Sequence, residues 1–236
     1  MFNQYNPFKD NRTEQMRDLW KYYVPFPGLD GSAKPVVVEG GRGSGKTMFF
    51  QCNSWRQILS QLRKNGKAIP ALFSEYDFVG IYYRVDTTFV SSMCNREADN
   101  WDAIFETYLS ICIIQEILDL IDAASKDMVI DESTLSQFVS NFSKRMNGNS
   151  KVDSLRAFRR ETDLYLDIIE DKINGLNSSS EINLRWVNAH RIIRDMCVAC
   201  NELFQKELLF KIFIDEYETL QEYQQKIINT LIINKA

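Results

Sequence analysis

Eight consecutive residues decide the fold class of this chain: Gly40-Gly41-Arg42-Gly43-Ser44-Gly45-Lys46-Thr47. They fit the pattern G-x-x-x-x-G-K-[ST] at every position. Just before them, residues 35–39 form a short β-branched run, which predicts a buried strand. After the last glycine, residues 46–65 have the pattern of one helix that ends at an Asn-Gly pair. The stretch is therefore predicted to be a glycine-rich loop between a strand and a helix.

The residue types in this loop suit the binding of nucleotide phosphates. Glycines let the backbone curl until successive N–H groups point into one concavity at the start of a helix. Lys46 is expected to bring a positive charge to the β- and γ-phosphates and to serve catalysis, and the Thr47 hydroxyl to bind Mg²⁺. Arg42 would contact a phosphate or an adjoining subunit. A glycine-rich turn that carries Lys-Thr by chance is the weaker alternative, so the sequence predicts a P-loop that binds ATP with Mg²⁺.

An acidic pair follows the clearest apolar strand, residues 208–214. Asp215 and Glu216 come at the carboxyl end of that strand, where open α/β sheets bind their ligands. We expect Asp215 to be a second Mg²⁺ ligand and Glu216 to polarise the attacking water. The other interpretation is an acidic pair that merely opens a turn. Asp86, at the end of the strand predicted at residues 79–86, would either hold a metal-bound water or cap the next turn.

The rest of the chain reads as helices around these strands. A helix is predicted at residues 12–24 and a last one at 221–234. Between strands, the helical pattern is almost continuous, with segments at 101–124, 131–146, 152–174 and 182–204. Because about a hundred residues exceed a plain crossover connection, we interpret them as an inserted subdomain. The predicted parts are 1–100, the N-terminal part of an ATPase core; 101–205, a helical insertion; and 206–236, the second core segment.

Bulk composition narrows the class of protein. The chain has 236 residues, of which 44% are hydrophobic, and a formal net charge of −4. That balance does not support binding of nucleic acid through bulk charge. No signal peptide and no membrane-spanning run is visible, and five cysteines scattered in apolar segments are typical of reduced thiols. The expectation is a cytoplasmic protein without a membrane partner.

Two weaker signals favour ordinary structural roles. Cys197 and Cys200 form a C-x-x-C with His190 upstream, but one pair is half a zinc site, so buried thiols are expected. Four arginines of the helical segment could act as an arginine finger in an assembled oligomer, although a solvated helix face is the better interpretation. They are Arg159, Arg160, Arg191 and Arg194.

Several segments together resemble the bacterial Orc/Cdc6-like AAA ATPases. They are residues 6–8 (NPF), 19–25 (LWKYYVP), the loop at 40–47, 80–86 (GIYYRVD), 101–108, 213–220 (FIDEYETL) and 224–232. The resemblance implies an α/β P-loop NTPase with an AAA-like three-layer core and a largely α-helical insertion. It also implies ATP hydrolysis or slow switching, and contacts in a homo-oligomer or with an effector protein. Relatives of this type look like components of anti-phage defence modules. An acid directly after the strand aspartate and the lack of an Asn-Lys-x-Asp signature favour adenine as the base.

The chain departs from that family pattern at its C-terminal side. A complete AAA sheet has strand order 5-1-4-3-2, and only strands one to three are recognised, at residues 35–39, 79–86 and 208–214. We therefore expect an incomplete sheet, as in a piece of a longer protein or a chain completed by a partner. A gap is expected between residues 36–38 and 212–214, empty or filled by another segment.

Three functions stay open at this point. The first is an ATP-hydrolysing AAA-type switch or motor subunit in a multiprotein assembly, favoured by Asp215 and Glu216. The second is a non-hydrolysing regulatory or scaffold module that holds ATP to fix a conformation, favoured by the missing sensor strand. The third is an initiator-like DNA-binding ATPase, against which the acidic balance counts.

Overall fold

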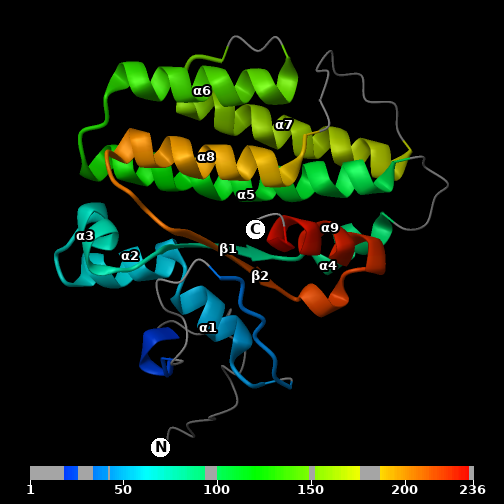
Figure 1. Ribbon diagram of the computed structural model, residues 1–236, viewed down its shortest axis with the longest axis horizontal. Coiled ribbons are helices and arrows are strands. Elements are labelled where there is room, and N and C mark those ends of the chain that lie inside the picture. Colours follow the sequence, from blue (N-terminus) through cyan, green and yellow to red (C-terminus); the bar gives the residue numbers. More distant parts are fainter. Residues whose placement is uncertain are drawn as a thin grey trace, which may run out of the picture.

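A computed structural model describes residues 19–25, 34–41, 43–93, 100–148, 152–175 and 187–233 of the chain. The fold is mixed α/β and mostly helical, with a small sheet of two parallel strands (Figure 1). The strands are β1 (Val79–Arg84) and β2 (Phe210–Asp215). The helices are α1 (Lys46–Cys52), α2 (Trp55–Lys64), α3 (Ile69–Glu75), α4 (Thr87–Ser92), α5 (Trp101–Asp127), α6 (Glu132–Asn147), α7 (Leu155–Asn174), α8 (Ala189–Phe204) and α9 (Glu222–Ile233).

The four long helices pack together as a bundle. Helix α5 contacts α7 and α8, and α6 contacts the same two helices from the other side. Short polar side chains begin three of these helices, because each accepts a hydrogen bond from a backbone N–H of the first turn. These caps are Asp131 for α6, Ser154 for α7 and Asn188 for α8. The bundle confirms the helical segments predicted at 101–124, 131–146 and 152–174, with shifts of up to three residues at their ends. Of the segment predicted at 182–204, residues 189–204 are helical and 182–186 lie outside the described residues.

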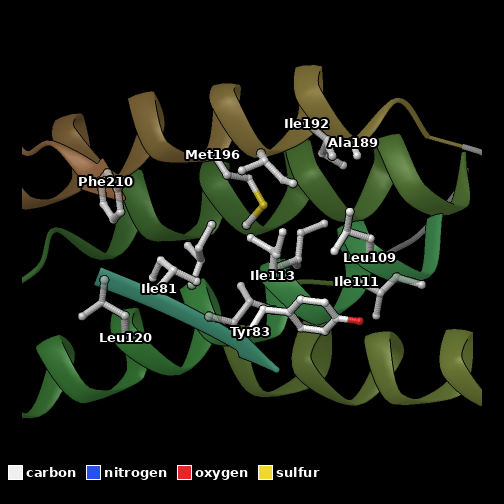
Figure 2. Packing of buried hydrophobic residues seen from close by; sticks show 14 of the residues in the cluster. Ile81, Tyr83, Leu109, Ile111, Ile113, Leu120, Ala189, Ile192, Met196 and Phe210 are labelled. Carbon is white, nitrogen blue, oxygen red and sulfur yellow. The ribbon is translucent and has the colours of Figure 1, made fainter. Parts of the chain in front are cut away.

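One face of the sheet packs on the bundle. Ile81 and Tyr83 of β1 are buried against α5, and Figure 2 shows them among side chains of α5 and α8. A single apolar cluster runs from these strand residues through α5 to the interior of the bundle. Such a shared core binds the helices and the sheet to one another through apolar burial. The proposed division at residues 101 and 205 stays a prediction.

The opposite face of the sheet packs on α1 and on the junction between α1 and α2. The Phe50 ring of α1 stacks on the Phe213 ring of β2, with 5.6 Å between centroids. The backbone of the junction approaches β1 closely at Gly80, where an added Cβ would lie 2.0 Å from the Asn53 carbonyl oxygen. Only glycine permits that approach. The sheet therefore lies between α1 and the bundle.

The prediction of a strand at residues 35–39 is wrong. This segment is outside the sheet, and Val36 and Val37 keep 52% and 80% of their surface exposed. An apolar, β-branched run becomes a strand only where a neighbouring strand pairs with its backbone, and β2 pairs with β1 in the described part of the chain. The expected lack of pairing between residues 36–38 and 212–214 is what the structure has.

The helix expected at residues 46–65 is two helices. Asn53 ends α1, and its side-chain amide donates to the Phe49 carbonyl, while the Ser54 side chain accepts from the Gln57 N–H and caps α2. Short polar side chains that bond the backbone in this way compete with continuous helix. Helices α3 and α4 were not predicted at all. Of the helix expected at 12–24, residues Leu19–Lys21 form a 3₁₀ turn, and 12–18 lie outside the described residues.

None of the helices in the described ranges combines the length and the apolar character needed to cross a membrane.

Candidate functional site

The glycine-rich loop has the backbone that its sequence predicts. Gly43 and Gly45 have φ angles of 83° and 89°, a left-handed conformation that favours glycine. The Ser44 N–H donates to the Gly41 carbonyl at 3.1 Å, which closes a tight turn before α1. The Lys46 ammonium folds back over the loop and donates to the Gly40 carbonyl oxygen. Arg42 lies outside the described residues. The loop is thus a compact turn with a lysine held above it.

The direction of α1 shows which end of the sheet the loop approaches. Gln51 of α1 hydrogen-bonds the side chain of Tyr82, and two residues further along the helix the Asn53 carbonyl lies beside Gly80. Helix α1 therefore runs antiparallel to β1. The first turn of α1, with Thr47, accordingly points toward the carboxyl ends of both strands. Thr47 is also four residues from Gln51, so both lie on the helix face that meets the sheet.

Asp215 ends β2 and is nearly buried, with 4% of its surface exposed. Its Oδ2 accepts a hydrogen bond from the Tyr82 hydroxyl at 3.0 Å, and its Oδ1 accepts from the Glu216 N–H at 3.1 Å. An ionised carboxylate offers about four lone-pair directions, so these two bonds leave oxygen lone pairs for a cation. Oxygen ligands of this kind fit Mg²⁺. The donor set at the end of β2 is therefore compatible with the metal that the sequence predicts.

Glu216 has an unusual backbone and a charged partner. Its φ angle is 63°, in the left-handed region that side chains other than glycine rarely adopt. Its Oε1 lies 3.4 Å from Nη2 of Arg84, the last residue of β1. The two side chains border an open hollow of about 450 Å³, with Val85, Asp86 and Thr87 as the remaining lining residues. The carboxylate proposed to orient water thus lies beside a cavity and in an ion pair.

Asp86 lies on the rim of this hollow and caps a helix. Its Oδ1 accepts hydrogen bonds from the N–H groups of Thr88 and Phe89, both at 3.0 Å, and so begins α4. Of the two roles expected for it, helix capping is confirmed, and the bond to a metal-bound water stays a prediction. Asp86 also fixes where the chain leaves the end of β1.

The cysteines and the histidine of α8 behave as structural residues. Cys200 is fully buried and Cys197 partly buried, and both are reduced thiols. Burial raises the pKa of Cys200 well above its usual value, which keeps the thiol protonated. Within the described ranges, no three His, Cys, Asp or Glu side chains come together in a way that could hold a metal ion. His190 is partly buried in the first turn of α8.

The candidate arginine fingers differ in their surroundings. Arg159 is in ion pairs with Asp119 of α5, at 3.3 Å, and with Asp163 of its own helix. Arg194 pairs with the neighbouring Asp195 at 2.9 Å. Arg160 and Arg191 are exposed on their helices. The expectation of a solvated helix face fits Arg160, Arg191 and Arg194, whereas Arg159 is partly buried and links α7 to α5.

Three residues of the site escaped prediction from sequence: Gln51, Tyr82 and Arg84. The strand alternation places Tyr82 and Arg84 on one face of β1, and the register sets Arg84 opposite Asp215. That alternation is the only signal in the sequence, and it becomes useful only when the partner strand and its register are known.

Comparison with known proteins identifies the family of the chain. A model of the ORC-CDC6-like family matches residues 6–235, nearly the whole chain. No curated protein and no solved structure matches it. With its glycine-rich loop, its parallel strands and its terminal acidic pair, the chain belongs to the ORC-CDC6-like family, a group of AAA-type P-loop ATPases that bind nucleotide.

Proposed function

We propose that this chain binds ATP with Mg²⁺ between the loop at residues 40–47 and the carboxyl ends of β1 and β2. The observation that carries the proposal is the antiparallel course of α1 and β1, fixed by the contacts of Gln51 with Tyr82 and of Asn53 with Gly80. This course turns the start of α1 toward Asp215 and Glu216. Motif and topology therefore support the same site independently.

Each candidate residue has a defined task in this proposal. The N–H groups of the loop and the Lys46 ammonium bind and orient the phosphates. The Thr47 hydroxyl and the Asp215 carboxylate would hold Mg²⁺, and the ion would supply positive charge to the phosphate oxygens. Glu216 accepts a hydrogen bond from the attacking water and orients it toward the γ-phosphate. The product would be ADP and phosphate, from a subunit that acts as a nucleotide-dependent switch or motor.

A second function is favoured by one observation, the ion pair between Arg84 and Glu216 at 3.4 Å. A glutamate whose carboxylate pairs with an arginine is less free to orient an attacking water. A chain in that state would hold ATP without rapid turnover, as a regulatory or scaffold module does. Turnover by the assembled protein distinguishes the two functions.

The cellular setting rests on the family resemblance. An AAA-type subunit works in an assembly because a neighbouring subunit commonly supplies the cation that completes the site. We propose a homo-oligomer, or a complex with an effector protein, and anti-phage defence in the cytoplasm as its context.

The test is nucleotide-dependent thermal stability. A ligand that binds only the folded state at a hundred times its Kd adds about 2.7 kcal/mol to the free energy of unfolding. We expect Mg²⁺-ATP to raise the Tm of the parent chain, and Lys46→Ala to abolish the rise. The matched control is Lys126→Ala, which removes an exposed lysine whose pair with Asp122 lies on α5. A parent chain that shows no shift with Mg²⁺-ATP contradicts the proposal.

A further inference from the structure

We propose that Tyr82 is a positioning residue for Asp215, which it holds in the orientation that binds Mg²⁺. This inference rests on the proposed function, since it concerns the metal side of the same site. No motif of the loop or of the acidic pair includes Tyr82, which lies in the middle of β1.

The geometry places the Tyr82 hydroxyl between the helix and the aspartate. It donates to Asp215 Oδ2 at 3.0 Å, and it is hydrogen-bonded to the Gln51 side chain of α1. Burying a carboxylate is costly unless hydrogen bonds compensate for the water it loses, and Asp215 is 4% exposed. The Tyr82 hydroxyl and the Glu216 N–H supply that compensation, one for each oxygen. Together they fix the plane of the carboxylate and thus the direction of its remaining lone pairs.

The hydrogen bonds of Tyr82 have a defined direction. Its hydroxyl donates to the carboxylate of Asp215, which as an ionised group can only accept, while its oxygen accepts from the Gln51 amide. The direction of the chain of hydrogen bonds is then fixed, from Gln51 through Tyr82 to Asp215.

This chain also joins Asp215 to the helix that carries Thr47, the other residue proposed to hold Mg²⁺. Thr47 lies one helical turn before Gln51 on the same face of α1, and Asp215 is at the other end of the chain. A displacement of α1 along the sheet thus changes the hydrogen bond that orients Asp215. Phosphate binding at the loop and metal binding at β2 should accordingly depend on each other through Tyr82.

The experiment compares two neighbouring tyrosines on opposite faces of β1. Tyr82→Phe removes the hydroxyl that contacts Asp215, whereas Tyr83→Phe removes one from the buried face that meets the bundle (Figure 2). The readout is the Kd for ATP by titration calorimetry, with Mg²⁺ and with EDTA. A hydrogen bond to a charged group contributes about 1.5 kcal/mol, or roughly tenfold in Kd. We expect Tyr82→Phe to weaken Mg²⁺-ATP binding about tenfold while ATP in EDTA binds as before, and Tyr83→Phe to preserve the Mg²⁺ dependence.

The outcomes separate this inference from the function on which it rests. A parent chain that binds no ATP overturns the proposed function. A parent chain that binds Mg²⁺-ATP, together with a Tyr82→Phe variant of unchanged Mg²⁺ dependence, overturns the positioning role alone. Adding Asp215→Asn gives a further check, because Tyr82→Phe should then cause no additional loss. If circular dichroism shows that Tyr82→Phe does not fold, Gln51→Met decides: a several-fold loss confined to the Mg²⁺ titration supports the role, and no loss overturns it.

Discussion

Among single residues, Glu216 combines an uncommon backbone conformation with a position at the end of β2, beside the hollow. Its left-handed φ of 63° follows directly on β2 and turns the chain sharply, so that its side chain meets Arg84 at the hollow. Non-glycine residues keep such a conformation when their surroundings demand it, often at functional sites. The geometry supports a residue placed for chemistry at the end of the strand.

We expect Glu216→Gln to bind ATP normally and to lose turnover. The amide has the size of the carboxylate but cannot act as a base, and a positioned acid–base group contributes about 10²–10⁴-fold to rate. Phosphate release by the assembled protein should therefore fall by roughly a hundredfold or more, with the Kd for Mg²⁺-ATP unchanged. Glu218→Gln is the control, because Glu218 is exposed two residues later. If Glu216→Gln and the parent turn over ATP at the same rate, another residue is the base.

Sequence alone located the loop and the acidic pair more readily than the elements around them. The loop and the acidic pair could be found because phosphate and magnesium binding demand particular residue types at fixed spacing. Tyr82 and Arg84 could not, since their relevance depends on the register between β1 and β2, which brings Arg84 opposite Asp215. Pairing over more than a hundred residues leaves no local signal.

Among the elements, the contact between β1 and the α1–α2 junction fixes where the loop lies. Ser54 makes the junction possible, because its side chain donates to the Gln51 carbonyl at 2.7 Å and also caps α2. The apolar spacing is nearly continuous across both helices, and it therefore predicts a single helix. Two other missed elements did carry start signals: a proline in the first turn of α3 and Asp86 before α4.

Gly80→Ala should destabilise this junction. The added methyl group would lie 2.0 Å from the Asn53 carbonyl oxygen and 2.6 Å from the Phe213 ring, so α1 must shift away from the sheet. Overpacking of this kind costs about 1–3 kcal/mol, and a backbone clash places this case at the upper end. Urea unfolding without nucleotide measures the loss. Gly41→Ala, where an added Cβ has no atom within 4 Å, should leave the free energy of unfolding nearly unchanged. Similar stability of the two variants would show that α1 does not approach β1 so closely.

For the whole molecule, two features favour association with other chains. In the described part of the chain, β2 pairs with β1 along one edge, and no strand is assigned along its other edge. The apolar residues Val36 and Val37 are exposed in a segment without assigned secondary structure. Open strand edges next to apolar side chains promote pairing between molecules. The resemblance to the family predicts a gap beside β2. The composition of residues 35–39 predicts a strand in the sheet, and this is wrong, because a local sequence pattern does not show whether a strand has a neighbour to pair with.

We expect the chain to self-associate as its concentration rises, and Val37→Lys to weaken that association. The charge of a lysine opposes burial of the segment against another copy. Sedimentation velocity over a concentration series measures the effect. Val129→Lys is the control, since Val129 is 96% exposed in the connection between α5 and α6. A parent chain that stays monomeric throughout the series contradicts this expectation.

Helix α5 has a mechanical consequence that its role in the core does not reveal. With 27 residues it is about 40 Å long, and it touches different parts of the protein at its two ends. Near its start, the Tyr108 ring stacks on Phe89 of α4, next to the hollow that holds Glu216; at its end, Asp127 accepts a hydrogen bond from the Ile69 N–H of α3 (Figure 1). Because one continuous helix contacts both regions, we expect a displacement of its first turns to be transmitted along its length. A change beside the acidic pair would then reach α3 through α5.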